Sequence, residues 1–264
     1  MLTFSEFKSA FASLNLGAKP AIAHASVKSF GVIQGGAATV LQALLTSVGG
    51  LIMPAFTYKT MIIPEVGPPN NGLTYGSYKD HNRMAEPFRT DMPVDALMGI
   101  LPETLRHYPG AHRTAHPILS FVGVNAGPAL HAQTIYNPFA PIGVLADQDG
   151  WVLLLGVDHT VNTSIHYAEK LAGRPQFVRW ALSKNRVVEC YGFPGCSEGF
   201  YEITPDLEQD VRRVEVGNSF IDAVPLKRLL QVVEARIHKD PLALLCHRQE
   251  CERCQAVRKM LAAG

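Results

Sequence analysis

The chain has 264 residues, of which 47% are hydrophobic and 18% charged, with 24 basic and 23 acidic side chains. This composition supplies material for a sizeable core, and a net charge of +1 argues against nucleic-acid binding, which usually requires a clustered basic excess. No apolar run approaches the ~20 residues of a membrane span, and no signal-peptide segment opens the chain. We therefore expect a cytoplasmic protein that binds neither nucleic acid nor membrane.

Helical and strand patterns alternate in the first part of the chain. A helix is predicted over 3–14, where phenylalanine and leucine recur at helical spacing. Strands are predicted over 21–25 and 51–56, on either side of a glycine-led helix over 35–48. A strand–helix–strand unit of this kind is typical of a parallel sheet.

The segment 57–92 has no sustained periodicity and is rich in proline, glycine and asparagine. Long loops within compact domains are usually functional or mobile, so we interpret this segment as a flap on the substrate side. A helix is predicted over 92–108, a strand over 120–124 and a short helix over 127–133, and 137–146 bridges to the next strand.

The last part of the chain predicts a strand pair over 177–181 and 186–190, joined by a turn at Asn185. Helices are predicted over 206–214 and 224–235. No repeat, low-complexity tract or clear linker interrupts the chain, so one domain over 1–264 is expected.

The densest group of reactive side chains follows the apolar strand 152–155, in a polar run that ends at Glu169. Ligands of open α/β sheets bind where strands end and helices begin. If Thr163 or Ser164 caps the next helix, His166 and Glu169 lie three residues apart on one helical face. A histidine beside a carboxylate is the arrangement that a general base needs.

Four segments of this chain resemble motifs of one enzyme family: His24–Gly31, Leu51–Thr57, Arg113–Ser120 and Trp151–Glu169. The segments resemble motifs of the aminoglycoside 3-N-acetyltransferases, which transfer acetyl from acetyl-CoA to an amine, and they occur in the same order along the chain as in that family. The resemblance implies an α/β fold, a three-layer α/β/α sandwich whose mixed central sheet is covered by helices on both faces. It also implies a CoA-dependent N-acetyltransferase that acts by direct transfer, for which the 3-amino group of an aminoglycoside is one candidate acceptor.

Acetyl-CoA, the expected co-substrate, brings phosphates that suit a helix N-terminus preceded by glycines. From spacing alone, an ordinary surface loop is the better interpretation of the Ser/Lys/Gly segment that precedes this helix. The resemblance assigns it to CoA instead, although Ala25 replaces a family serine. The candidate donor-side residues are Ser26, Lys28, Ser29, Phe30, Gly31, Thr114 and Ser120. Alternatively, the Ser120 hydroxyl is structural and forms a hydrogen bond with the end of a neighbouring strand.

The resemblance places the family's general base at His166, with Glu169 orienting it, since an imidazole can accept a proton at neutral pH. The candidate substrate-binding residues are Thr57, Asp158, His159 and Asn162. Asn162 is equally suited to cap the following helix, and His116 is either structural or on the donor side. Thr160 stands where the family has an acid, and the chain offers few carboxylates to a polycation, so other amines stay open as acceptors.

All five cysteines lie in the last third of the chain, and Cys251 and Cys254 have the spacing of a chelating pair. The predicted ligands of a structural Zn²⁺ are Cys190, Cys196, Cys251 and Cys254, within the region 190–254. Some family members carry such a zinc, with an upstream ligand that matches Cys196. Cys190, Cys246 and His247 are alternatives for completing the set, and free thiols are the competing interpretation.

Two other classes of function stay open. One is an acyl-CoA-binding or zinc-stapled scaffold without significant turnover, and the other is a metal-dependent hydrolase with His159 and His166 as ligands. The expected partners are acetyl-CoA and a small amine, and monomer and homodimer are both compatible with the sequence.

Overall fold

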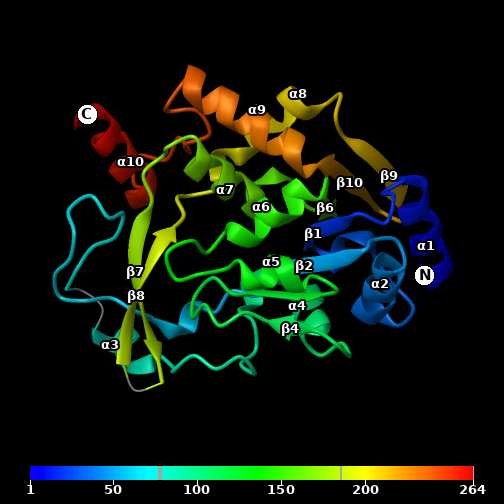
Figure 1. Cartoon of the computed structure of the whole chain (residues 1–264), viewed down its shortest axis with the longest axis horizontal. Helices are drawn as coiled ribbons and strands as arrows, with labels where there is room; N and C mark the ends of the chain where they lie inside the picture. Colours follow the sequence, from blue (N-terminus) through cyan, green and yellow to red (C-terminus); the bar gives the residue numbers. More distant parts are fainter. Residues whose placement is uncertain (77–78, 185, 264) are drawn as a thin grey trace.

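The computed structural model describes residues 1–76, 79–184 and 186–263, and a seven-stranded sheet forms its centre (Figure 1). The strands of this sheet are β1 (Pro20–Ala25), β2 (Gly50–Pro54), β4 (His112–Arg113), β5 (Phe121–Val124), β6 (Trp151–Leu155), β9 (Arg212–Val216) and β10 (Ser219–Pro225). Their order is β4–β5–β2–β1–β6–β10–β9. β1 runs parallel to β2 and β6, whereas the outer pairs are antiparallel. The parallel strand–helix–strand unit is therefore present inside a mixed sheet.

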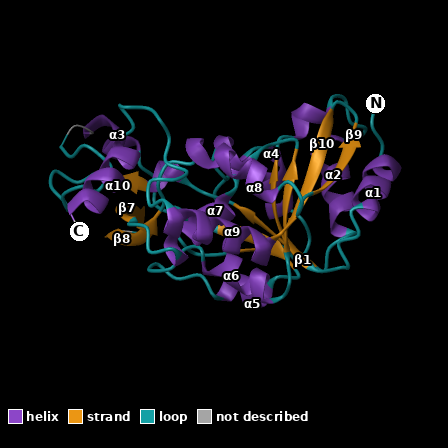
Figure 2. Ribbon diagram, turned by 90° about the horizontal axis from the view of Figure 1, so that it is seen from above, coloured by secondary structure: helices purple, strands orange, loops and turns teal. Residues whose placement is uncertain are grey.

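Helices lie on either side of this sheet (Figure 2). The helices around it are α1 (Phe4–Ser13), α2 (Gly36–Leu45), α4 (Ile100–Arg106), α5 (Gly127–His131), α6 (Ala140–Asp147), α7 (Thr163–Leu171), α8 (Thr204–Leu207) and α9 (Leu226–Lys239). Successive strand residues face opposite sides, so Ala21 and Ala23 join the core under α1, α2 and α4, and Ile22 joins the core under α5, α6, α7 and α9. The predicted three-layer α/β/α fold with a mixed sheet is confirmed.

A second, three-stranded sheet lies at the other end of the molecule, near α3 (Lys79–Met84) and α10 (Glu252–Ala263) (Figures 1 and 2). Its strands are β3 (Met61–Ile62), β7 (Phe177–Ser183) and β8 (Arg186–Phe193). β3 comes from the segment 57–92, so part of the predicted flap is a strand of this sheet. Residues 77–78 of that segment and the predicted turn residue Asn185 lie outside the described residues.

Short 3-10 helices occupy several of the connections. They are η1 (Val27–Phe30), η2 (Tyr58–Thr60), η3 (Ala96–Met98), η4 (His159–Val161) and η5 (Glu198–Ile203). The helix predicted over 92–108 is wrong at its start, since 92–95 are not helical, and the rest is divided by Gly99, which adopts a φ of 80° between η3 and α4. Among the described residues, no helix has both the length and the apolar character required to cross a bilayer.

The helix predicted over 206–214 is wrong. Helix α8 ends at Leu207, and the chain from Arg212 forms an antiparallel hairpin of β9 and β10. Val214 and Val216 alternate with charged residues, which is the period of a half-buried strand, and a turn at Gly217 and Asn218 joins the pair.

The core should be most sensitive at the centre of β6. Leu153 is fully buried between Ala23 of β1 and Ala223 of β10. We expect Leu153→Ala to lower the free energy of unfolding by about 2–5 kcal/mol, because it leaves a cavity in a packed layer. Leu97→Ala is the matched control, since Leu97 is 80% exposed, and should change stability by less than about 0.5 kcal/mol. Denaturant unfolding measures both, and equal effects would contradict the packing described.

Candidate active site

A buried array of three side chains follows the end of β6. His166 Nδ1 lies 2.7 Å from Glu169 Oε2, and Arg174 Nη1 donates to Glu169 Oε1 at 2.6 Å. Arg174 also donates to the carbonyls of Pro241 and Ala243 at 2.8 and 2.7 Å. A carboxylate only accepts, so Nδ1 of the neutral imidazole carries the proton and Nε2 keeps its lone pair. That is the protonation pattern of a general base.

Two aromatic rings hold the imidazole of His166. The Phe139 ring stacks on it with centroids 6.0 Å apart, and the Phe200 ring meets it edge-on at 4.7 Å. Phe139 precedes α6 and Phe200 lies in η5, so segments before and after α7 in the chain hold the His166 ring. No sequence signal marked Arg174, because it lies beyond the end of α7 and acts only through the folded chain.

His24 is a buried residue to which the sequence assigned no role beyond a place in a motif. It lies at the end of β1, on the same strand face as Ile22, and packs on the side of α7. Burial, followed by the fields of His159 and His166, lowers the pKa of His24 to about 3. Because β1 and β6 are parallel, His24 lies at the same end of the sheet as the segment that carries His159 and His166, and His24 is neutral at physiological pH.

The loop between β6 and α7 is held by its own polar side chains. Asn162 caps α7 by accepting from the Ser164 N–H at 3.1 Å, so the helix begins one residue after Asn162 and is not capped by Thr163 or Ser164. The Asn162 amide also donates to His159 Nδ1 at 3.2 Å. Asp158 is exposed and accepts from the N–H and hydroxyl of Thr160 at 2.8 and 2.5 Å.

Burial lowers the pKa of His159, against the opposing fields of Asp222 and Asp158. Asp158 belongs to the loop and is exposed, whereas Asp222 lies on β10 and accepts from Arg213 at 2.6 and 2.7 Å. Within the loop, one carboxylate, that of Asp158, directly precedes the buried His159.

The predicted donor segment forms η1 directly after β1. Ser26 N–H donates to Leu155 of β6 at 2.9 Å, and the Ser29 hydroxyl donates to Ser26 at 2.7 Å. Lys28 and Gly31 are exposed, whereas the Phe30 ring is buried edge-on against Phe7 at 5.4 Å. The Phe30 ring is thus a core side chain, and Ser26, Lys28, Ser29 and Gly31 remain near the surface.

Gly156 allows this donor segment to approach the end of β6. Its φ is +65°, and a Cβ at this position would overlap the Ser29 side chain. Only glycine combines that backbone conformation with so close a contact. The donor segment and the loop that carries His159 are therefore neighbours.

Thr57, Thr114 and Ser120 are occupied by internal hydrogen bonds. Arg113 donates to the Ser120 hydroxyl at 3.0 Å and to the Thr57 hydroxyl at 2.5 Å, and Ser120 donates to the Ala55 carbonyl at 2.6 Å. The Thr114 hydroxyl accepts from Phe121 N–H at 2.8 Å. Thr57 and Ser120 are 1% and 0% exposed, so both lie inside the protein, and Ser120 makes the bond to a strand end that was its alternative role.

The sulfurs of Cys196, Cys246, Cys251 and Cys254 are buried and lie within 4.8 Å of one another; we call this group the cysteine quartet. Tetrahedral Zn²⁺ with Zn–S bonds of ~2.3 Å requires sulfurs about 3.8 Å apart, so small adjustments would fit the quartet to one ion. A hydrogen bond from the Cys254 thiol is the largest cause that lowers the pKa of Cys196, to about 4, which favours the thiolate form that metals bind.

Cys190, which we predicted as a ligand, is outside the quartet, and Cys246 takes the fourth position. Cys190 lies in the core on β8, where burial raises the pKa of its thiol to about 12. The side chain of His247 is 89% exposed and lies 2.8 Å from Glu202. In the part of the chain that the structure describes, the quartet is the one group of three or more His, Cys, Asp or Glu side chains with metal-binding geometry. His159 and His166 are not part of that group.

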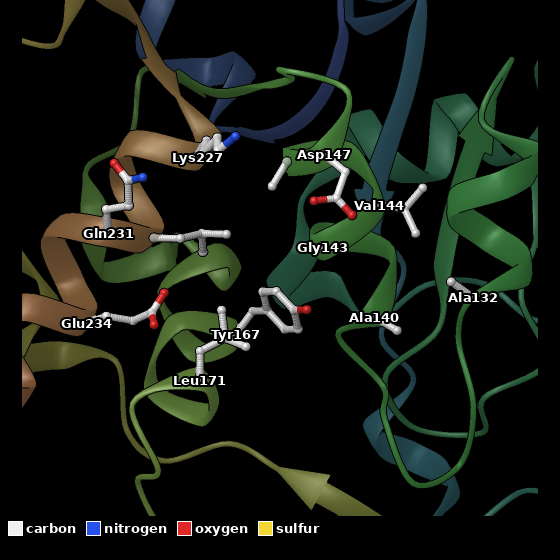
Figure 3. A pocket seen from close by; sticks show the side chains of 12 residues that line it. Ala132, Ala140, Gly143, Val144, Asp147, Tyr167, Leu171, Lys227, Gln231 and Glu234 are labelled. Atoms are coloured by element: carbon white, nitrogen blue, oxygen red, sulfur yellow. The ribbon is translucent and has the colours of Figure 1, made fainter.

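A hollow of about 380 Å³ lies on the outer helical layer between α6, α7 and α9 (Figure 3). Tyr167 and Leu171 of α7 line it together with Asp147 and Glu234. Burial, and then the fields of both carboxylates, raise the pKa of Tyr167. None of the residues predicted for catalysis or binding lines this hollow, so it is separate from the array around His166.

A family model described as aminoglycoside 3-N-acetyltransferase matches residues 22–238. The chain belongs to this family. The aminoglycoside N(3)-acetyltransferase IV of a Salmonella species is 27% identical to it over 88% of this chain and 87% of that protein. The predicted enzyme class, an acetyl-CoA-dependent acetyltransferase of this family, is confirmed.

Solved structures of the family share the fold. The apoenzyme of AAC(3)-IVa superposes with a TM-score of 0.78 and 24% identity, over 98% of this chain and 97% of that chain. A binary complex of AAC-IIIb with CoASH superposes with a TM-score of 0.70 and 21% identity, over 90% of this chain and 96% of that chain.

The buried His116 predicts how stability depends on pH. Its Nδ1 accepts from the N–H groups of Ile118 and Leu119, and burial lowers its pKa from 6.5 to about 4. Between pH 6.5 and about 4, His116 is protonated in the unfolded chain but stays neutral in the folded chain. Protonation therefore favours the unfolded state, and the free energy of unfolding decreases as the pH falls from 6.5 towards 4. The loss approaches about 1.4 kcal/mol per pH unit.

His116→Asn keeps an acceptor near the Nδ1 position and removes the titrating group. We expect denaturant unfolding between pH 7 and 5 to show a shallower pH dependence for this variant than for the wild type. Identical slopes would show that His116 is not buried as a neutral imidazole.

Proposed function

We propose that the protein transfers acetyl from acetyl-CoA to the 3-amino group of an aminoglycoside, with His166 as general base. The observation that carries the proposal is the array of His166, Glu169 and Arg174, which presents an imidazole with a fixed tautomer after the end of β6, where Gly156 brings the donor segment close to the loop that precedes α7. Among the described residues, no hydrogen bond engages His166 Nε2, which leaves this atom available to the acceptor amine.

In this mechanism the neutral amine attacks the thioester carbon, and His166 Nε2 takes the amine proton as the new N–C bond forms. The C–S bond then breaks, and the imidazolium returns the proton to the leaving CoA sulfur, so the products are the amide and free CoA thiol. Glu169 stabilises the transient imidazolium across the 2.7 Å contact to Nδ1.

The donor side is proposed to be η1 and the glycine-led start of α2. Helix α2 has ten residues with Gly35 at its N-cap, so the N–H groups of its first turn are free to bind the CoA phosphates. The exposed Lys28 adds a positive charge to this side. The relative solved with CoASH supports CoA as the donor carrier. AAC(3)-IVa has been solved as a variant in complex with a gentamicin, which supports an aminoglycoside acceptor. Asp158, next to His159, is our candidate for attracting the ammonium groups of the aminoglycoside.

We also propose that residues 1–264 form one acetyltransferase domain. Ile22 and Ile52 of the seven-stranded sheet share a continuous core with Phe177 and Ala181 of the three-stranded sheet, which supports a single folding unit. None of the five cysteines, all of which the structure describes, forms a disulfide, and this favours a reducing, cytoplasmic location.

The cysteine quartet is proposed to hold a structural Zn²⁺. Four thiolates close the coordination sphere and leave no position for substrate, so the ion would take no part in acetyl transfer. It would instead connect the loop of Cys196 and the segment of Cys246 to the start of α10.

The assay for the proposed function is release of free CoA thiol from acetyl-CoA with a panel of aminoglycosides and small amines. We expect turnover with at least one aminoglycoside, and His166→Ala should lower kcat about 10²–10⁴-fold, since the base is lost. His131→Ala is the matched control, because His131 is exposed and lies outside the array. Wild-type turnover by a folded His166→Ala variant would refute the assignment.

The metal proposal is tested by the zinc content of the purified protein. We expect about one equivalent in the wild type and in Cys190→Ser, and a loss of most of it in Cys254→Ser, since the lost thiolate opens the site. Circular dichroism checks that each variant is folded. Retention of zinc by Cys254→Ser, or its loss in Cys190→Ser, would contradict the assigned ligands.

A further inference from the structure

The first turn of α10 contacts the segment 67–76, which belongs to the interval 57–92. The Thr74 hydroxyl donates to the Glu252 carboxylate. Glu252 stands between Cys251 and Cys254 in the chain, so the residue that holds Thr74 is flanked by two members of the cysteine quartet. Neither the acetyl-transfer mechanism nor the binding of a metal uses this contact.

A second contact packs the same segment against α10. A Cβ on Gly72 would come within 3.0 Å of both Arg253 Cα and the Phe177 ring, and the φ of Gly72 is +58°. Arg253 Nη1 also donates to the carbonyl of Gly195 at 2.9 Å, and Gly195 directly precedes Cys196. The helical turn that carries the chelating pair therefore touches both the segment 67–76 and the loop of the third cysteine.

The segment has an independent anchor on β7. Arg179, which is 3% exposed, donates to the carbonyls of Asn71 and Gly72 at 2.9 and 3.2 Å. Asn71 donates to the Tyr75 hydroxyl at 2.8 Å, and Tyr75 donates in turn to Pro68 at 2.9 Å. The anchor on β7 holds the base of the segment, and α10 holds its far side through Thr74 and Gly72.

We propose that Glu252 and Arg253 are positioning residues that couple metal binding at the cysteine quartet to the order of the segment 67–76. The four sulfurs come from three stretches of chain, and thiol–thiol contacts alone hold them weakly, whereas an ion bound by all four fixes the first turn of α10. The fixed turn then presents Glu252 to Thr74 and packs Arg253 on Gly72. Coupling of this kind is reciprocal, so an ordered segment also tightens the metal site.

The consequence for catalysis rests on the proposed function and on the interpretation of the interval 57–92 as a substrate-side flap that borders the acceptor. An ordered segment should lower the KM for the acceptor and leave the KM for acetyl-CoA unchanged, since the donor segment lies on η1, away from α10. Occupancy of the quartet thereby sets acceptor affinity without contact between the metal and any substrate.

The test compares hydrogen exchange in the zinc-loaded wild type with the same protein after chelation. We expect amides of 67–76 to exchange about tenfold faster without zinc, and amides of α1 and α2 to stay within about twofold. The acceptor KM should rise about tenfold with little change in the KM for acetyl-CoA. Equal exchange in 67–76 with and without zinc, or no zinc uptake by the wild type, would overturn the proposal.

Variants separate the coupling from the metal site itself. Thr74→Val removes the hydroxyl but no thiolate, and it should exchange rapidly in 67–76 with zinc still bound. Thr90→Val is the matched control, because Thr90 is an exposed threonine of the same interval. Glu252→Ala provides a second test should Thr74→Val fold poorly, and Glu252→Gln, which keeps an acceptor oxygen, should restore most of the protection.

Wild-type, zinc-dependent protection in both Thr74→Val and Glu252→Ala would overturn the proposal. The exchange measurement uses Zn²⁺ alone and no substrate. A chain that acetylates no aminoglycoside but shows zinc-dependent protection of 67–76 would refute the proposed function and leave the coupling intact.

Discussion

The catalytic side of this molecule depends on one buried carboxylate. Moving the Glu169 carboxylate out of water costs several kcal/mol unless partners compensate it, and Arg174 and His166 each engage one of its oxygens. Arg174 is in turn held by the carbonyls of Pro241 and Ala243. The same stretch of chain continues to Cys246, so the array that orients His166 and the quartet are joined by a short length of backbone.

This arrangement suits a base that must be charged only briefly. In the proposed mechanism, Glu169 stabilises the transient imidazolium of His166, and the rings of Phe139 and Phe200 hold this side chain in one orientation. His24, close by, stays neutral because it is buried, and a neutral neighbour adds no repulsion when His166 takes a proton. Glu169 is therefore the direct charge partner of His166, and the buried rings of Phe139, Phe200 and His24 around it are uncharged.

The sequence predicted most where side-chain periodicity is strong. The helical spacing of His166 and Glu169 placed both on one face of α7, and they are in contact. The helix predicted over 206–214 was wrong, since charged residues concealed the two-residue period of β9 and the partner strand β10 was not recognised. The assignment of His166 as the base stays a prediction, as does the role of η1 in binding CoA.

The sequence by itself determined the family, the alternation of strands and helices and the local pair of His166 with Glu169, because these depend on neighbours within a few residues. Only the tertiary structure decided that Arg174 completes the array, that Cys246 and not Cys190 joins the quartet, and that Thr74 meets Glu252. Each of these joins residues that are not neighbours on a helix or strand. Sequence spacing carries no information about such contacts, since they arise when separate elements pack on one core.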